Sequence, residues 1–333
     1  MGLENGKVMN SLRYNIEAVA GDASFRKFYR IRYKGKSKII VYAEKEKYKN
    51  LIVYSAINKF LRNNKILAPK LISNDYKKGI IVIEDFGDKT FYKELLKKKN
   101  KFATYRKLVD LLLKIQKIKP TFKLRSFDGK IYKVDKYSNK YLFKESNLFF
   151  DWYLSLFLNK KKVAKIKKKS KKILLKIYNK INFSNSYFVH RDFHVQNLMK
   201  VNKKIGVIDS QDALIGNPAY DLVSLIDDVR IKIPINLKKK ILNYYLIKTE
   251  NIYAKNKYKF LEDFNILSVQ RNLKIIGIFS RLFKRDNKKQ YLRLIPYTWK
   301  ILEMRMKSKI FLELKQLLNK NISKKIRRKK IDL

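Results

Sequence analysis

Cysteine is absent from this 333-residue chain, and histidine occurs only twice. Without thiols the chain can form no disulfide, no thiolate zinc site and no cysteine nucleophile. Two histidines without cysteine also argue against a transition-metal site. No stretch approaches the roughly 18 uncharged apolar residues that a membrane-spanning helix needs, and the N-terminus lacks an apolar leader segment. We therefore expect a soluble, cytoplasmic protein without a membrane partner.

Acidic residues are scarce as well. The chain has 28 Asp and Glu against 80 Lys and Arg, which gives a formal net charge of +52. Such a charge ordinarily indicates nucleic acid or an anionic surface as partner. However, Lys is enriched everywhere, together with Asn, Ile, Tyr and Phe, and this favours codon bias as the cause. The basic runs at 160–162 and 167–169 lack interleaved aromatics. We expect no nucleic-acid partner, and only the tail 324–330 retains a phosphate-binding interpretation.

The apolar pattern changes from strand-like to helix-like along the chain, whose length suggests two structural units. In the first part we predict strands at 15–20, 27–33, 38–43, 71–73 and 79–83 and a helix at 51–63. Beyond it we predict helices at 91–98, 102–118, 148–158, 165–181, 237–250, 261–284 and 297–318 and strands at 187–189, 198–200 and 205–208. The sequence therefore predicts an α+β fold, with a β-rich unit at 1–87 and a mainly helical unit at 88–333.

Both histidines lie in one phrase, His190-Arg191-Asp192-Phe193-His194-Val195-Gln196-Asn197. It matches H-R-D-x-x-x-x-N, the catalytic-loop pattern of protein kinases, and the next apolar run ends at Asp209. Phosphoryl transfer needs an oriented nucleophile and metal ions that neutralise phosphate charge. Asp192 is the candidate base, while Asn197 and Asp209 offer the oxygen ligands that Mg²⁺ prefers. We expect His190 to brace the loop through backbone hydrogen bonds.

Two phrases distinguish the chain from protein kinases. Ser210-Gln211-Asp212 follows Asp209 in place of Phe-Gly, and Gly216-Asn217-Pro218-Ala219-Tyr220-Asp221-Leu222 stands in place of Ala-Pro-Glu. The sequence instead resembles the aminoglycoside phosphotransferase and choline kinase superfamily of small-molecule kinases. The phrases at 21–30, 148–154, 208–213, 220–225 and 270–282 are similar to those of bacterial anomeric N-acetylmuramate/N-acetylglucosamine kinases.

This resemblance implies a protein-kinase-like two-lobe fold and ATP-dependent, Mg²⁺-assisted phosphorylation of the anomeric hydroxyl of an amino sugar. The product would be a sugar 1-phosphate used in cell-wall recycling. The resemblance also implies that residues 21–26 cover the ATP phosphates and that the lobes are joined near 84–87. The residues expected to contact the nucleotide are Gly21, Ala23, Ser24, Phe25, Arg26, Glu84 and Phe86.

One position departs from the wider kinase plan. The third strand lacks the lysine that usually pairs with the α- and β-phosphates, so Lys45 or Lys47 would have to reach in from its end. Ser210 also stands where this subfamily would have phenylalanine, which predicts softer packing beside the metal site.

For the acceptor, the candidates are Gln211 and Asp212, since amide and carboxylate groups bond sugar hydroxyls well, and Arg271. Arg271 and Lys274 lie on one helical face, where they would meet the lactyl carboxylate of N-acetylmuramate. A solvated basic face is the simpler interpretation of that pair.

Two alternatives remain open on the sequence. The same core would serve another acceptor such as choline, homoserine or an aminoglycoside, although a polycationic drug needs an acidic pocket that so basic a chain hardly offers. A nucleic-acid-binding protein on an inactive kinase scaffold would explain the charge of +52. The intact Asp192, Asn197 and Asp209 favour an enzyme, with an amino sugar as its small-molecule acceptor.

Overall fold

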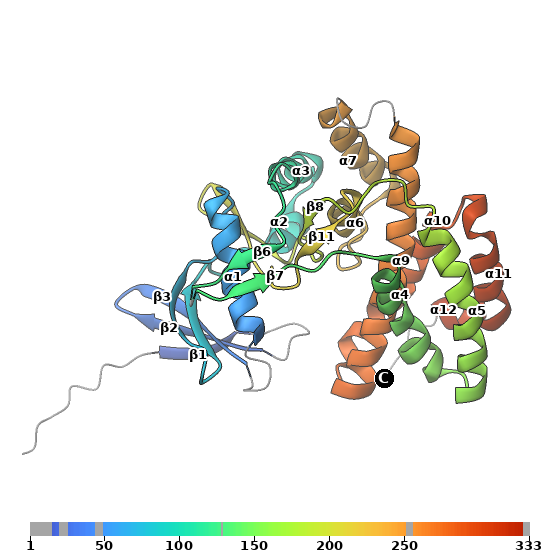
Figure 1. The fold of residues 1–333 in the computed structure, drawn as a ribbon, viewed down its shortest axis with the longest axis horizontal. Coiled ribbons are helices and arrows are strands. Elements are labelled where there is room, and N and C mark those ends of the chain that lie inside the picture. Colours follow the sequence, from blue (N-terminus) through green and yellow to red (C-terminus); the bar gives the residue numbers. More distant parts are fainter. Residues whose placement is uncertain (1–14, 20–25, 44–48, 128, 251–255, 329–333) are drawn as a thin grey trace, which may run out of the picture.

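The computed structural model describes residues 15–19, 26–43, 49–127, 129–250 and 256–328. A five-stranded antiparallel sheet and one helix form the N-terminal lobe, and mainly helices form the rest (Figure 1). Within these residues, no helix is both long enough and apolar enough to cross a membrane.

The N-lobe sheet has the strand order β1-β2-β3-β5-β4. Its elements are β1 (Asn15–Val19), β2 (Lys27–Tyr33), β3 (Lys36–Tyr42), α1 (Lys49–Asn63), β4 (Leu71–Asp75) and β5 (Ile80–Glu84). Lys34 and Gly35 both have positive φ and join β2 to β3 in a two-residue turn, the geometry that matches the twist of a hairpin. The predicted order of three strands, one helix and two strands is confirmed.

The C-lobe consists of helices around three two-stranded ribbons. Its helices are α2 (Phe91–Lys97), α3 (Phe102–Gln116), α4 (Asn139–Leu148), α5 (Lys160–Tyr178), α6 (Ala219–Ile226), α7 (Ile235–Lys248), α9 (Lys257–Asp286), α10 (Ile295–Arg305), α11 (Leu312–Asn321) and α12 (Lys324–Arg328). The ribbons pair β6 (Lys123–Arg125) with β7 (Ile131–Lys133), β8 (Tyr187–Val189) with β11 (Leu214–Gly216), and β9 (Leu198–Val201) with β10 (Lys204–Val207).

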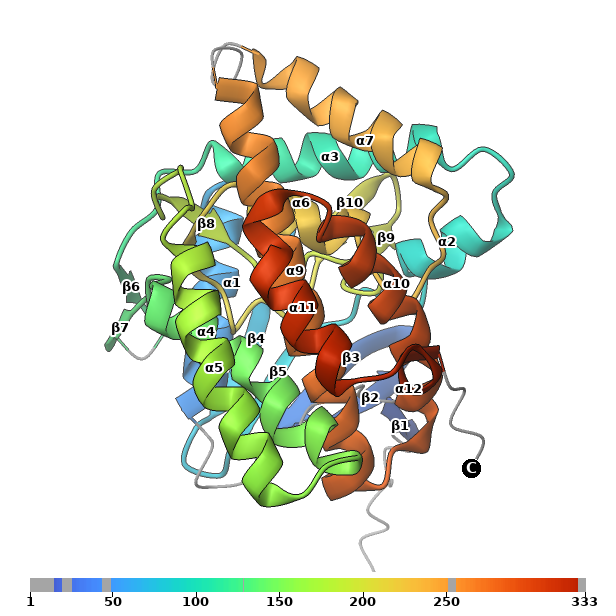
Figure 2. The same cartoon turned by 90° about the vertical axis from the view of Figure 1, so that its right-hand side faces the viewer.

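The long helix α9 runs through the C-lobe and packs against α4, α6 and α10 (Figure 2). A Cβ at Gly277 would lie 2.3 Å from the backbone carbon of Leu148, so only glycine allows α9 to pass this close. The contact is made where α4 ends and a π-helical turn, Phe149–Tyr153, begins. The close approach of α9 therefore coincides with a local change of helical winding.

Two predicted helices differ from the structure. The predicted helix 148–158 consists of the π-helical turn and a 3₁₀ turn that extend α4. Helix α4 itself was not predicted, because its sequence is largely polar. The predicted helix 297–318 is split into α10 and α11, because the chain leaves helical geometry at Met306 and Ser308. Apolar periodicity continues across both breaks, so periodicity alone does not locate them.

Two apolar cores share α1. Leu51 and Tyr54, near its N-terminus, pack with the inward side chains of the sheet. Ala56, Ile57 and Leu61, further along the same helix, belong to the large core of the C-lobe. Helix α1 thus lies between the two lobes and contacts both.

Candidate active site

The catalytic loop is held by a buried carboxylate at the start of α6. Asp221 accepts the backbone amides of His190 and Arg191 at 2.7 and 2.9 Å. Nε2 of His190 lies 3.1 Å from the carbonyl oxygen of Ile208, in agreement with its expected bracing role. Arg191 has φ +72°, a strained backbone geometry for a residue with a Cβ. The loop therefore turns sharply at Arg191 and leaves the Asp192 side chain 36% exposed.

Asn197 and Asp209 lie at the same end of the β9–β10 hairpin. Leu198 pairs with Val207, and the amide of Ile208 donates to the carbonyl of Asn197 at 3.0 Å. The side-chain Nδ2 of Asn197 donates to the carbonyl of Asp192 at 3.0 Å, which leaves its Oδ1 as a ligand atom. Asp209 has φ +63°. One amide oxygen and one carboxylate are thus presented beside the catalytic loop, a donor set suited to Mg²⁺.

Three or more His, Cys, Asp or Glu side chains do not cluster into a metal site anywhere in residues 15–19, 26–43, 49–127, 129–250 and 256–328. A magnesium site of the kind that uses one or two carboxylates, and completes its octahedron with water and substrate phosphates, does not require such a cluster. Asn197 and Asp209 fit such a site, and a protein cage for the metal is not needed.

Arg26 contacts the candidate metal ligand. Its Nη2 lies 2.8 Å from Oδ1 of Asp209, and its guanidinium packs over the rings of Phe28 and Tyr54. Its side chain is only 5% exposed. Of the predicted phosphate loop, Gly21, Ala23, Ser24 and Phe25 lie outside the described residues, so Arg26 is its one described member. A fixed guanidinium therefore stands beside the carboxylate of Asp209.

Ser210 connects the metal-site strand to α1, and the expected softer packing there is wrong. The side chain is fully buried, and its hydroxyl donates to Oδ1 of Asn58 at 2.7 Å. The Nδ2 of Asn58 in turn donates to the carbonyl of Pro69 at 3.3 Å. A phenylalanine would fill this space with carbon, whereas serine makes a directed hydrogen bond. The position after Asp209 is therefore tied to the N-lobe helix.

Replacing Ser210 with alanine should destabilise the protein by about 1–3 kcal/mol, because Oδ1 of Asn58 would remain buried without its donor. Urea denaturation followed by circular dichroism measures this free energy of unfolding. Ser308→Ala is the matched control, since Ser308 is exposed and makes no capping hydrogen bond. Equal stability of the two variants would show that the Ser210–Asn58 bond contributes nothing net.

The segment that joins the lobes is fixed from both sides. The carboxylate of Glu84 accepts Nη1 of Arg62 at 3.3 Å and the amide of Lys70 at 3.2 Å. The ring of Phe86 lies against Gly206, where a Cβ would come within 2.7 Å of it. Both side chains therefore contact protein groups.

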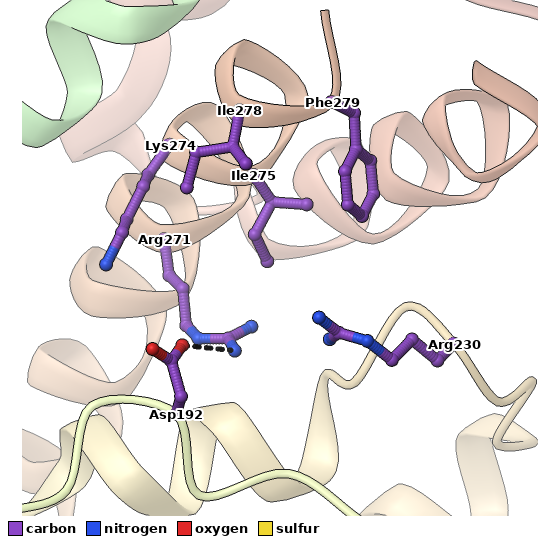
Figure 3. A pocket seen from close by; sticks show the side chains of 7 residues that line it. All are labelled: Asp192, Arg230, Arg271, Lys274, Ile275, Ile278 and Phe279. Atoms are coloured by element: carbon purple, nitrogen blue, oxygen red, sulfur yellow. Dashed lines mark ion pairs between the residues drawn. The ribbon is translucent and has the colours of Figure 1, made fainter. Parts of the chain in front are cut away.

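The basic pair on α9 faces inward, so the simpler interpretation of a solvated face is wrong. Arg271 is 4% and Lys274 is 8% exposed. Together with Arg230 they surround one side of Asp192 (Figure 3). Nη2 of Arg271 lies 4.0 Å from Oδ1 of Asp192. Burial alone would raise the pKa of Asp192, but the Lys274 and Arg271 cations outweigh it and lower that pKa below its ordinary value.

Glu145 on α4 links the catalytic loop to α9, and no sequence motif marks it. Its buried carboxylate pairs with Arg191 and lies 2.8 Å from Nζ of Lys274. It also accepts Nε2 of Gln270 at 3.0 Å and the hydroxyl of Tyr137 at 3.2 Å. In the sequence it is one glutamate in a lysine-rich stretch, and only its spatial partners distinguish it.

Gln211 and Asp212 do not line the cavity beside Asp192. Gln211 is buried, and its Nε2 donates to Oδ2 of Asp212 at 3.1 Å. The Asp212 side chain is 58% exposed, and its backbone oxygen accepts Nη1 of Arg191 at 3.0 Å. Of the three predicted acceptor residues, the structure therefore brings only Arg271 next to the candidate base.

The sequence matches the phosphotransferase enzyme family over residues 15–258. The chain belongs to this family. The N-acetylmuramate/N-acetylglucosamine kinase of Pseudomonas aeruginosa is 28% identical over 85% of this chain and 81% of its own length. The enzyme of the same name from Neisseria meningitidis is 26% identical over 85% of this chain and 83% of its own.

Solved structures with the same fold include small-molecule kinases of other specificities. An ADP-bound aminoglycoside phosphotransferase aligns with a TM-score of 0.59 and 14% identity over 91% of this chain and 95% of its own. Choline kinase of Cryptosporidium parvum aligns with a TM-score of 0.58 and 15% identity over 95% of this chain and 94% of its own. The predicted family and the predicted protein-kinase-like α+β fold are thus confirmed, and the chain is a phosphotransferase.

Proposed function

We propose that this enzyme transfers the γ-phosphoryl group of ATP to the anomeric hydroxyl of N-acetylmuramate or N-acetylglucosamine. The observation that carries the proposal is the position of Asp192, between the Asn197–Asp209 end of the hairpin and a cationic cavity on α9. Its support from the comparisons is the similarity to two kinases of these amino sugars over 85% of the chain. A sugar 1-phosphate formed in the cytoplasm would then enter cell-wall recycling.

On the nucleotide side, Gly21 to Arg26 would cover the phosphates and the backbone near Glu84 and Phe86 would hold the base. Lys45 and Lys47 lie outside the described residues. Arg26 lies 2.8 Å from Asp209, so it would take the part of the missing third-strand lysine. Mg²⁺ held by Asn197 and Asp209 would neutralise charge on the phosphates.

On the acceptor side, Asp192 is ionised at neutral pH because its pKa is lowered. Its carboxylate can therefore orient the acceptor hydroxyl and accept its proton. The new bond joins the acceptor oxygen to the γ-phosphorus, the bond from that phosphorus to the β–γ bridging oxygen breaks, and ADP leaves. Arg271, 4.0 Å from Asp192, favours the charged form of this carboxylate.

Positively charged acceptors fit this site poorly. Three cations and one carboxylate line the cavity beside Asp192. Choline and aminoglycosides carry positive charge, which the Arg230, Arg271 and Lys274 side chains would repel. A neutral or anionic sugar meets no such repulsion, which supports an amino-sugar acceptor.

The proposal is tested by incubating the enzyme with Mg²⁺-ATP and N-acetylmuramate, N-acetylglucosamine, choline or kanamycin in parallel. ADP release and the phosphorus spectrum of the product are read together. We expect a sugar 1-phosphate from the amino sugars only. ATP binding without turnover of either amino sugar would disprove the proposal.

The magnesium site is tested with Asp209→Asn, which should raise the Mg²⁺ concentration for half-maximal rate at least about tenfold. The reason is the loss of the one charged ligand that the hairpin supplies. Asp286→Asn, a surface carboxylate paired with Arg285, is the matched control and should leave the magnesium titration unchanged. An unaltered titration in Asp209→Asn would place the metal elsewhere.

A further inference from the structure

A small cavity of about 50 Å³ adjoins the candidate base (Figure 3). It is lined by Asp192, Arg230, Arg271, Lys274, Ile275, Ile278 and Phe279. At about 10–15 Å³ for each water position, this volume takes one functional group of the size of a carboxylate and not a whole hexosamine. The cavity therefore has room for one substituent of an acceptor.

The polar wall of the cavity has unused hydrogen-bonding capacity. Arg271 is 4% exposed, and its Nη1 is buried without a hydrogen-bond partner among the described residues. A buried guanidinium N–H left without an acceptor is costly, so a ligand atom is expected there. Its Nη2 reaches Asp192 only at 4.0 Å. Arg271 is thus held next to the base with a buried donor that no described residue pairs.

Arg230 and Lys274 differ in how far their charge is already neutralised. Nζ of Lys274 forms a close pair with Glu145 at 2.8 Å. Nη1 of Arg230 is 3.6 Å from the buried Asp228, a looser contact than a direct hydrogen bond, and its side chain is 19% exposed. Arg230 therefore remains able to bind an incoming anion, and in Figure 3 its guanidinium lies across the cavity from Arg271.

The opposite wall is apolar. Ile275, Ile278 and Phe279 come from consecutive turns of α9 and face the same space. An anion carried on a short aliphatic arm would place carbon against these side chains and oxygen against the two arginines. A hydroxyl or a bare phosphate would leave the apolar wall unused.

We propose that Arg230 and Arg271 bind the carboxylate of the acceptor, so that the enzyme prefers N-acetylmuramate, whose lactyl group is a carboxylate on a short aliphatic arm, to the neutral N-acetylglucosamine. This inference rests on the proposed function. Charge-assisted bonds to an arginine fork are strong and directional, and a neutral sugar leaves the arginines without a partner. The enzyme therefore discriminates between the two sugars because N-acetylglucosamine leaves the donors of Arg230 and Arg271 unpaired.

The test compares kcat/KM for the two sugars in wild type and in Arg230→Gln. We expect wild type to prefer N-acetylmuramate. In the variant, the ratio of kcat/KM for N-acetylmuramate to kcat/KM for N-acetylglucosamine should fall about ten- to a hundredfold. Arg285→Gln, a surface arginine on the same helix as Arg271, is the matched control and should keep the wild-type ratio. Arg230→Lys should recover part of the preference, because charge remains but the fork is lost.

A second comparison needs no variant. Wild type is assayed with N-acetylmuramate and with its carboxamide, which has the same shape without the charge, and we expect a loss of at least about tenfold. Equal rates for acid and amide, a wild type without preference, or equal losses for both sugars in Arg230→Gln would each overturn the inference while leaving the proposed kinase intact. Failure of wild type with both sugars would instead overturn the proposed function.

Discussion

Replacing Asp192 with asparagine is expected to lower kcat by about 10²- to 10⁴-fold while ATP still binds. The Asp192 carboxylate is the candidate acceptor of the proton of the acceptor hydroxyl, and removing a general base costs this range. Asparagine keeps the size of the side chain and its place beside Arg271. The loss therefore reports the charge and the proton acceptor and not the packing.

Single-turnover and steady-state rates with a saturating amino sugar measure this effect. KM should change much less than kcat, because the hydroxyl is oriented mainly in the transition state. Asp135→Asn, at an exposed position after β7, is the matched control and should retain full activity. A loss below about tenfold in Asp192→Asn would show that this residue is not the base.

Replacing Glu145 with glutamine is expected to destabilise the protein by about 3–5 kcal/mol. The change leaves Arg191 and Lys274 buried without their common carboxylate, and breaking a buried ion pair from one side has this cost. Urea denaturation of the two proteins measures it. Glu313→Gln, which removes an exposed partner of Lys176, should alter the free energy of unfolding by less than about 1 kcal/mol.

Acid should erase the difference between wild type and Glu145→Gln. Burial raises the pKa of Glu145, but the charges of Lys274 and Arg191 outweigh burial and lower the pKa to about 2. A folded-state pKa below the unfolded value of 4.5 means that the contribution is complete above pH 4.5 and disappears as pH falls toward 2. The difference in the free energy of unfolding should therefore shrink below pH 4.5 and disappear near pH 2, which unfolding curves recorded between pH 7 and 2 measure. Parallel curves would show that Glu145 does not supply this stability.

The sequence was most informative where chemistry requires particular residues at particular spacing. A β-hairpin brings Asp209 next to the loop from His190 to Asn197, and the short stretch of sequence between them predicts that hairpin. It was least informative where distant segments meet. Glu145 becomes important only because α4 crosses α9, and Arg230 only because the loop after α6 faces Arg271. No periodicity within one segment encodes such a meeting.

Arg271 and Lys274 also show that a sequence pattern does not reveal contacts with distant segments. A basic pair on one face of a helix ordinarily marks the solvent side, and this expectation failed because a carboxylate from another segment lies opposite each residue. The prediction of softer packing at Ser210 failed for a similar reason, since the hydrogen-bond partner of Ser210, Asn58, comes from the other lobe. Charge and polarity predict exposure only when no distant partner is available.

The position of helix α1 in both cores affects how the protein unfolds. Because Ile57 and Leu61 belong to the core of the C-lobe, a fragment that begins at residue 88 would lack part of its own interior. The strand-rich and helix-rich halves differ in composition, yet they share a buried element and should melt together in one cooperative transition. Exchange of the first 87 residues with those of a relative would have to preserve the inward face of α1, or the recipient would lose the packing that surrounds its catalytic hairpin.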